Sequence, residues 1–270
     1  MADKQQVQLG PVQQTLMITL HARAHETGKR RPVLRDPKAV EIVDAIDFDY
    51  DRYGRDAGGT VTVLRTSVFD LWVRRFLADH PHGTVVELGC GLNTRFERVD
   101  NGTLHWVDVD LPDTIALRRR FFSDDDRRTT IASSVLDDEW QRAVAERPGP
   151  YFFVAEGVLV YLDEADVLRM LAGLAAKFPG SFTAFDTYSR NMLVQQHKMA
   201  ERKDIPARWA WSCDDPRTLA DRIGMRVVDV TSVTRPPAEL RATLPWSYRL
   251  TLPLIDKVVN GFAGLTLFQA

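Results

Sequence analysis

The sequence VVELGCGLNT, residues 85–94, decides the fold. Its β-branched, apolar start predicts a buried strand, and Gly89 and Gly91 follow with one residue between them. Glycine at such positions removes the side chain that would keep the backbone away from a ligand. The stretch therefore predicts a strand that ends in a ligand-binding loop.

The spacing of the glycines indicates the kind of ligand. A dinucleotide-binding loop carries G-x-G-x-x-G, in which the third glycine eases packing of the helix against the strand. Here the third position is Thr94. The loop is therefore typical of a smaller adenosine ligand without a pyrophosphate, and a nicotinamide oxidoreductase is the least favoured interpretation.

An acidic residue supports this interpretation. Asp110 directly follows the next predicted strand, in WVDVDLP, and lies 19 residues beyond Gly91. An offset of about 20 residues is expected for a carboxylate that accepts hydrogen bonds from a ribose. We therefore expect Asp110 to bind the ribose of the adenosine.

Strand and helix patterns alternate on both sides of this loop. Apolar runs predict seven strands, over residues 84–88, 104–109, 129–132, 151–155, 181–185, 225–230 and 264–268. Helical periodicity predicts helices over residues 12–24, 36–46, 61–80, 112–122, 138–146, 164–178 and 216–223. Such alternation is typical of right-handed βαβ units, so we expect an α/β fold with a mostly parallel sheet and helices on both faces.

The composition excludes several classes of function. The chain has 35 Lys and Arg against 37 Asp and Glu, so no basic surface for nucleic acid is expected. No run of about 18 apolar residues is present, and we expect no contact with a membrane. Two cysteines, and six histidines without a metal motif, indicate no metal site and a cytoplasmic, reducing location.

Six stretches in chain order resemble the leucine carboxyl methyltransferase family, and within it the branch of tetracenomycin-type polyketide-synthesis O-methyltransferases. They are ARAHE (22–26), LRDPKAV (34–40), LRTSVFD (64–70), VVELGCGLNTR (85–95), WVDVDLPDTIALRR (106–119) and AEGVLVYL (155–162). The resemblance implies a Rossmann-like class I methyltransferase. It also implies a seven-stranded, mostly parallel sheet with one antiparallel strand near the C-terminus, and S-adenosyl-L-methionine as cofactor.

The patterns and the resemblance together divide one methyltransferase domain, residues 1–270, into four parts. Residues 1–60 are expected to form an N-terminal helical lid over the cofactor, and residues 61–188 the cofactor-binding core. Residues 189–215 are expected to be a helical insertion near the substrate. Residues 216–270 then complete the sheet.

The resemblance assigns candidate cofactor contacts by position. Arg65 matches the arginine that holds the carboxylate of the methyl donor, Arg23 matches a basic residue of the lid, and Glu156 matches an acid near the methionine end. The other candidates lie in the loops and strand ends that the family uses: Glu87, Gly89, Gly91, Asp110, Leu111, Ser134, Val135 and Tyr161. The family often has Asp-Leu near the adenine where this chain has Ser134-Val135, so a charge is missing there.

No motif identifies the acceptor or a catalytic side chain. The candidate contacts are Tyr188, Arg190, His197, Trp209 and Trp211. A carboxylate acceptor needs no general base, whereas a hydroxyl gains from one. We therefore expect an O-methyltransferase for a carboxylate or hydroxyl of a small polyketide-like metabolite. A protein C-terminal carboxyl methyltransferase and a cofactor-binding scaffold without turnover are the alternatives.

Three further patterns are interpreted structurally. The run Arg118-Arg119-Arg120 is typical of a solvated helix face. Cys90 is interpreted as a small loop residue, because no neighbouring group indicates a nucleophile. His21 and His25 lie one helical turn apart in the lid and are interpreted as structural.

Overall fold

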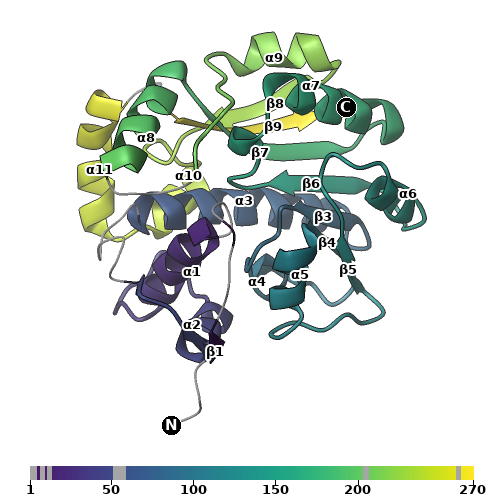
Figure 1. Ribbon diagram of the computed structural model, residues 1–270. Helices are drawn as coiled ribbons and strands as arrows, with labels where there is room; N and C mark the ends of the chain where they lie inside the picture. The colour runs from purple at the N-terminus through teal and green to yellow at the C-terminus, as the bar shows by residue number, and fades with distance from the viewer. Residues whose placement is uncertain (1–4, 7–9, 11–13, 51–58, 203–206, 260–262) are drawn as a thin grey trace.

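Seven strands form the central sheet of the computed structural model, in the order β5-β4-β3-β6-β7-β9-β8 (Figure 1). The structure describes residues 5–6, 10, 14–50, 59–202, 207–259 and 263–270. The strands are β3 (Thr84–Leu88), β4 (His105–Asp110), β5 (Arg128–Ala132), β6 (Tyr151–Ala155), β7 (Phe182–Tyr188), β8 (Arg226–Thr231) and β9 (Ala263–Gln269). β9 is antiparallel to β7 and β8, and the other pairs are parallel. The expected fold class is confirmed.

The strand order reverses at β3. The chain runs outward from β3 to β4 and β5, and it then returns to the other side of β3 with β6 and β7. Ligands bind in such sheets at the carboxyl ends of the strands, where the order reverses. Glu87 of β3 pairs with Val154 of β6, so the segments that follow these two strands are neighbours.

Helices cover both faces of the sheet (Figure 1). They are α3 (Gly59–Asp79), α4 (Arg95–Val99), α5 (Pro112–Arg118), α6 (Glu139–Ala145), the 3-10 helix η2 (Leu159–Tyr161), α7 (Glu164–Lys177), α8 (Arg190–Arg202), α9 (Pro216–Ile223), α10 (Ala238–Thr243) and α11 (Trp246–Val259). Within the described ranges, no helix is long and apolar enough to cross a membrane.

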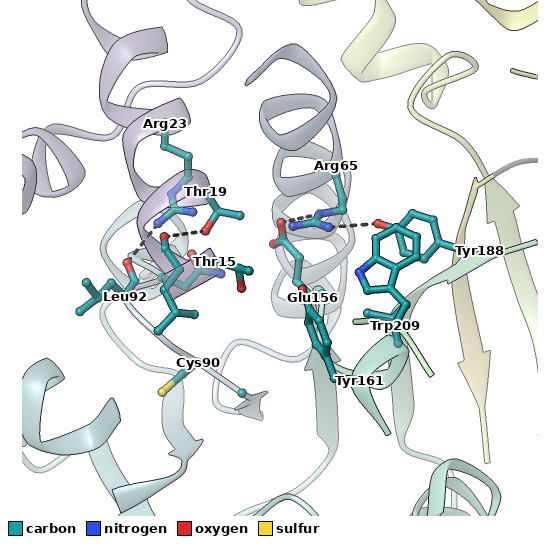
Figure 2. A pocket seen from close by; sticks show the side chains of 15 residues that line it. Thr15, Thr19, Arg23, Arg65, Cys90, Leu92, Glu156, Tyr161, Tyr188 and Trp209 are labelled. Atoms are coloured by element: carbon teal, nitrogen blue, oxygen red, sulfur yellow. Dashed lines mark hydrogen bonds and ion pairs between the residues drawn. The ribbon is translucent and has the colours of Figure 1, made fainter. Parts of the chain in front are cut away.

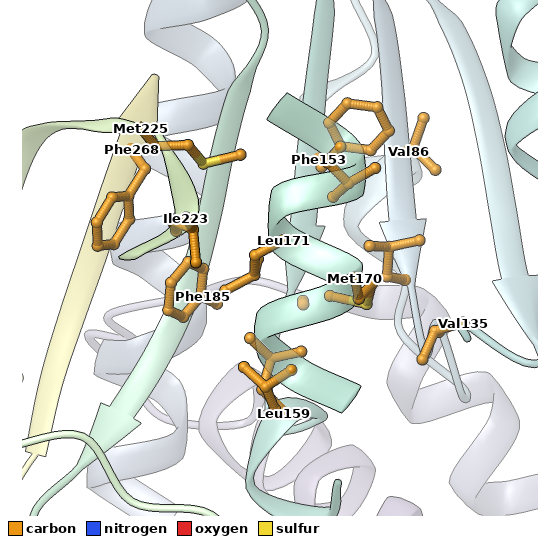
Figure 3. Packing of buried hydrophobic residues seen from close by; sticks show 14 of the residues in the cluster. Val86, Val135, Phe153, Leu159, Met170, Leu171, Phe185, Ile223, Met225 and Phe268 are labelled. Atoms are coloured by element: carbon orange, nitrogen blue, oxygen red, sulfur yellow. The ribbon is translucent and has the colours of Figure 1, made fainter. Parts of the chain in front are cut away.

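Alternation along the strands separates two hydrophobic cores. Val86 points to the core that α6, α7 and α9 cover, and its neighbour Val85 points to the core that α3 covers, because successive side chains of a strand face opposite ways. Figure 3 shows Leu171 of α7 packed in the first core, near Phe185 of β7. Both faces are buried, which explains why the strands are continuous apolar runs.

The N-terminal helices pack against the glycine loop. α1 (Gln14–Thr27) and α2 (Pro37–Ala45) enclose a third cluster, which includes Leu92 of the loop and Leu117 of α5. Asp36 begins α2 by accepting a hydrogen bond from the Ala39 amide at 2.9 Å, with Pro37 at the first position. A short parallel pair, β1 (Gln5–Gln6) and β2 (Ile46–Asp47), joins the start of the chain to the end of α2.

The structure corrects several predicted boundaries. β7 continues to Tyr188, beyond the predicted end at residue 185, because β9 pairs with it along its whole length. α5 ends at Arg118 rather than at residue 122, and α1 continues to Thr27. Residue 12 of the predicted first helix lies outside the described residues. Helices α4, α10 and α11 were not predicted.

Candidate active site

A cavity lies at the carboxyl edge of the sheet, between α1, α3 and the segments after β3 and β6 (Figure 2). It encloses about 620 Å³, a volume that includes the open solvent at its mouth. The predicted site residues that line it are Arg23, Arg65, Gly89, Glu156, Tyr161, Tyr188 and Trp209. The other lining residues are Thr15, Leu16, Thr19, Cys90, Leu92, Asn93, Gly157 and Val160.

Arg65 of α3 is the cation at the centre of this wall. Its Nε donates to Glu156 Oε1 at 3.0 Å, and its Nη1 donates to Asp186 Oδ2 at 3.0 Å. Burial opposes the charge, but Tyr188, Glu156 and Asp186 together raise the pKa of Arg65 above its ordinary value. Arg65 is therefore a permanent positive group, and its side chain keeps 14% of its surface exposed.

Glu156, directly after β6, is an ionised carboxylate with both oxygens occupied. Oε1 accepts from Thr66 Oγ1 at 2.8 Å as well as from Arg65, and Oε2 is paired with Arg95. Burial opposes ionisation, but Arg65 and Arg95 outweigh it, so the pKa of Glu156 lies below its usual value. A carboxylate held in this way is not free to accept a proton.

Asp186 was not predicted as a site residue, yet it organises this wall. Its Oδ2 accepts from the Tyr188 hydroxyl at 2.8 Å and from Arg65, and its Oδ1 accepts from the Gly157 amide at 2.8 Å. Burial and the Asp186 carboxylate raise the pKa of Tyr188 well above its ordinary value, so the phenol stays protonated. The signal in the sequence is an acid between aromatic residues, FDTY, which the predicted end of the strand excluded.

The two glycines of the loop adopt a left-handed backbone conformation. Gly89 has φ +63° and Gly91 has φ +49°, values that favour glycine over other residues. Asp110 fastens the loop, because its carboxylate accepts from the Gly91 amide and from the Leu111 amide, both at 2.7 Å. Burial raises the pKa of Asp110, although these two amides lower it.

Thr94 stands where a dinucleotide-binding loop has its third glycine, and its side chain connects the loop to the lid. Its buried hydroxyl donates to Asp36, the residue that begins α2. Arg23 of α1 donates to the same carboxylate at 3.0 Å and to the Leu92 carbonyl at 3.0 Å. Burial lowers the pKa of Arg23. The lid is therefore tied to the loop by charged hydrogen bonds.

Glu87 lies beneath the cavity and does not line it. It points to the face of the sheet that α3 and α4 cover, where Arg95 pairs with it and Asn93 Nδ2 donates to it at 2.9 Å. Burial raises the pKa of Glu87, although Arg95 opposes this shift. Arg95 also pairs with Asp70 of α3 at 2.9 Å. Glu87 thus stabilises the glycine loop through its hydrogen bond with Asn93.

The remaining predicted contacts lie outside the cavity. On the adenosine side these are Gly91, Asp110, Leu111, Ser134 and Val135. Leu111 is exposed, the Ser134 hydroxyl accepts from the Leu136 amide at 3.2 Å, and Val135 packs in the first core. Because the side chain of Leu16 in α1 would lie 2.6 Å from a Cβ on Gly91, the lid covers this part of the loop.

Three of the predicted acceptor contacts also lie outside the cavity. Arg190 is exposed at the start of α8, and its amide donates to Asp214 at 3.0 Å. His197 Nε2 lies 2.7 Å from the Trp209 carbonyl oxygen. Trp211 is buried in the first core, so the structure assigns it to packing rather than to a cavity wall.

The interpretation of the arginine run was wrong for Arg118. Helical periodicity places Arg118 on the buried face of α5, where it pairs with Asp108 of β4 at 2.9 Å. Its Nη1 also donates to the carbonyl oxygens of Gly91 and Asn93 at 2.9 and 2.8 Å. Arg119 and Arg120 are exposed, as expected.

Comparison with known proteins identifies the family. The family model described as leucine carboxyl methyltransferase matches residues 16–175, which is more than half of the chain. The chain belongs to the leucine carboxyl methyltransferase family. This family member is an S-adenosylmethionine-dependent methyltransferase, as the resemblance of its sequence motifs implies.

Two curated relatives support the assignment to the leucine carboxyl methyltransferase family. The tetracenomycin polyketide synthesis O-methyltransferase TcmP from Streptomyces glaucescens is 35% identical over 246 residues, covering 89% of this chain and 90% of the relative. The S-adenosyl-L-methionine-dependent methyltransferase dpfgK from Gibberella zeae is 27% identical, covering 82% of each chain. A solved structure of a putative methyltransferase from Thermobifida fusca has the same fold, with a TM-score of 0.57 at 19% identity over 93% of this chain and 94% of that one.

Proposed function

We propose that this family member transfers a methyl group from S-adenosylmethionine to a carboxylate oxygen of a small, polyketide-like acceptor. The similarity to the S. glaucescens relative over nearly the whole chain supports the acceptor class. The observation that carries the proposal is the set of charged groups in the cavity wall. It presents a fixed cation, Arg65, and its one carboxylate among the described lining residues, Glu156, is held by three donors.

The residues present fit S-adenosylmethionine. Arg65 and Arg23 suit the donor's carboxylate, and Glu156 suits its ammonium group. Gly89 lines the cavity without a side chain, and the side chains of Val158 and Leu16 pack where a Cβ on Gly89 or Gly91 would lie. Asp110 is half-buried and suits the ribose hydroxyls. On the adenine side the proposal assigns Leu111, Ser134 and Val135, and at the methyl end it assigns Tyr161.

The proposed transfer needs alignment rather than covalent catalysis. S-adenosylmethionine, when bound, supplies a methyl group activated by a positively charged sulfur. An oxygen lone pair of the acceptor forms the new O–C bond, while the S–C bond breaks and its electron pair stays on sulfur, which leaves S-adenosylhomocysteine. The chain's residues hold both partners in line and exclude water.

The cavity favours a carboxylate over a hydroxyl as acceptor. No histidine lines it among the described residues. Burial raises the pKa of the Cys90 thiol, and Tyr188 is held as a neutral phenol by Asp186. A phenol with a pKa of about 10 would need a base, whereas a carboxylic acid is ionised well below pH 7.

The first test is calorimetric binding of S-adenosylhomocysteine, with NAD as the control ligand. We expect micromolar binding to the wild type and binding at least ~10-fold weaker to Asp110→Ala, because a charge-assisted contact with the ribose is lost. Asp113→Ala is the matched control, since Asp113 is an exposed acid three residues further on. Binding of NAD, or no binding of S-adenosylhomocysteine to folded protein, would overturn the proposal.

The second test is a panel of acceptors with labelled methyl donor between pH 6 and 9. It contains small aromatic carboxylic acids, the corresponding phenols and a peptide that ends in a free leucine carboxylate. We expect turnover of small carboxylates at a rate that does not rise across this range. Phenol methylation that rises about 10-fold per pH unit would contradict the carboxylate assignment. Turnover of the peptide alone would favour the protein-tail alternative.

A further inference from the structure

The segment between α8 and α9 carries two tryptophans with different surroundings. Residues 207–213, here called the tryptophan loop, follow the described part of α8 and cross the carboxyl edge of the sheet. Trp211 is buried, with its ring centroid 6.4 Å from that of Phe185 in β7. Trp209 is half-buried, lines the cavity, and lies with its ring centroid 4.3 Å from that of Tyr188 (Figure 2).

Backbone hydrogen bonds fix the tryptophan loop to the body of the protein. The Val160 carbonyl oxygen in η2 accepts from the amides of Ala210 and Trp211 at 2.7 and 3.2 Å. The Cys213 amide donates to the Tyr188 carbonyl oxygen at 2.8 Å. Buried Trp211 anchors the same segment in the core. The backbone that follows Trp209 is therefore fixed by contacts with η2, with the end of β7 and with the first core.

The side chain of Gln196 in α8 forms hydrogen bonds with the backbone of the tryptophan loop. This buried side chain donates from Nε2 to the Ala207 carbonyl oxygen at 3.1 Å, and its Oε1 accepts from the Trp209 amide at 3.4 Å. His197 Nε2 lies 2.7 Å from the Trp209 carbonyl oxygen. Two adjacent residues of α8 thus bind the backbone of the residue whose ring faces the cavity.

The part of the cavity wall beside Arg65 and Glu156 is therefore aromatic, and hydrogen bonds hold it in place. Tyr188 presents its ring there, because its hydroxyl is engaged by Asp186 and Arg65. Trp209 packs against that ring, and Tyr161 lies beside Glu156 (Figure 2). An aromatic wall favours a flat, apolar group that stacks or meets it edge-on.

We propose that Trp209 is the specificity-determining residue for the acceptor, and that Gln196 is the positioning residue that holds it. The ring of Trp209 selects a planar ring system carrying the carboxylate that receives the methyl group. This inference rests on the proposed function, since it assigns the acceptor end of the same cavity.

The test compares two acids of one carbon skeleton, planar 2-naphthoic acid and its saturated decahydro form. Binding of each acid is measured by calorimetry with and without saturating S-adenosylhomocysteine. We expect the wild type to bind the planar acid at least ~10-fold more tightly than the saturated one, and Trp209→Ala to lose this preference. Trp209→Phe should retain most of it.

Controls separate this proposal from the proposed function and from misfolding. Trp246→Ala removes a tryptophan that is 65% exposed on α11, and it should leave the preference unchanged. Trp209→Ala should bind S-adenosylhomocysteine within about 2-fold of the wild type, whereas loss of that binding in the wild type would reject the cofactor assignment instead. Equal binding of both acids to the wild type, or of neither acid, overturns the inference, as does an unchanged preference in Trp209→Ala.

Gln196→Leu tests the positioning role, because leucine keeps the apolar bulk and loses both hydrogen bonds. We expect the preference for the planar acid to fall by about 3-fold, in line with the loss of hydrogen bonds that orient the loop. The ratio of the two affinities is the readout, since a purely structural role would lower both affinities together. An unchanged ratio rejects Gln196 as a positioning residue.

Discussion

Two buried ion-pair clusters have the same chemistry and different surroundings. The pocket cluster consists of Arg65, Glu156, Asp186 and Tyr188, and the β4 cluster consists of Asp108, Arg118 and Arg128. In the pocket cluster, Arg65, Glu156 and Tyr188 line the cavity. The β4 cluster lies on the same side of the sheet beneath α5, and none of its members lines the cavity.

Burial of a charge does not by itself identify a functional residue. Both clusters satisfy the rule that a buried charge needs a partner. Removal of Arg118 from the β4 cluster takes one cation from the fully buried Asp108, which keeps Arg128 and Trp106, and takes a donor from two carbonyl oxygens of the glycine loop, so stability should fall. Removal of a cation from the pocket cluster leaves carboxylates that retain other partners and lie beside a cavity, so ligand binding should suffer more than stability.

The largest expected effect is on the β4 cluster. Arg118→Leu should lower the free energy of unfolding by about 3 kcal/mol, because Asp108 keeps Arg128 but loses one buried charged partner, and the glycine loop loses two hydrogen bonds. Urea denaturation measures the change. Arg120→Leu, at an exposed position two residues away, should change it by less than about 0.5 kcal/mol. Equal effects of the two substitutions would show that Arg118 is not buried as described.

The next largest effect should be on the binding of S-adenosylhomocysteine when Arg65 is replaced. Arg65→Gln should weaken S-adenosylhomocysteine binding by roughly 100-fold, because the substitution removes the charge that we propose to bind the ligand's carboxylate. The free energy of unfolding should fall less than in Arg118→Leu, because Glu156 keeps Arg95 and Thr66, and Asp186 keeps Tyr188 and Gly157. If binding survives while stability collapses, the distinction between the clusters fails.

Two buried glutamates should make opposite contributions to the pH dependence of the free energy of unfolding. The pKa of Glu156 is lowered in the folded protein, so its stabilisation is present above the unfolded value of about 4.3 and is lost as the pH falls through the folded pKa. The pKa of Glu87 is raised, so its protonation favours the folded state as the pH falls. Unfolding free energies measured between pH 6 and 3 should therefore decline less steeply in Glu156→Gln and more steeply in Glu87→Gln than in the wild type. The same change of slope in both variants would contradict these opposite shifts.

The smallest effect should be at the adenine side. Ser134→Ala removes a hydroxyl that accepts from the Leu136 amide, and no charge is lost. S-adenosylhomocysteine binding should weaken by less than about 3-fold, as expected for a single neutral hydrogen bond. A loss larger than that of Asp110→Ala, measured in the same calorimetric series, would make Ser134 a principal contact.

The strands along the chain, and several of the residues that meet at the cavity, could be predicted because their signals are local. The apolar run before Gly89, the acid at the end of β4 and the motif around Arg65 each depend on a few adjacent residues. The predicted antiparallel strand near the C-terminus came from the resemblance to a family, and β9 confirms it. Boundaries were less accurate, as at β7, because cross-strand pairing rather than local composition decides where a strand ends.

The sequence by itself indicated the fold class and a small adenosine ligand, because the alternation of elements and the spacing in one loop carry that information, and the resemblance of its motifs to a family implied the cofactor. Only the tertiary structure decided that Asp186 organises the wall, that Arg118 is internal, and that Trp209 faces the cavity while Trp211 does not. These three outcomes depend on which elements meet across the sheet. A side chain's neighbours at such distances along the chain are set by packing, which no short stretch of sequence specifies.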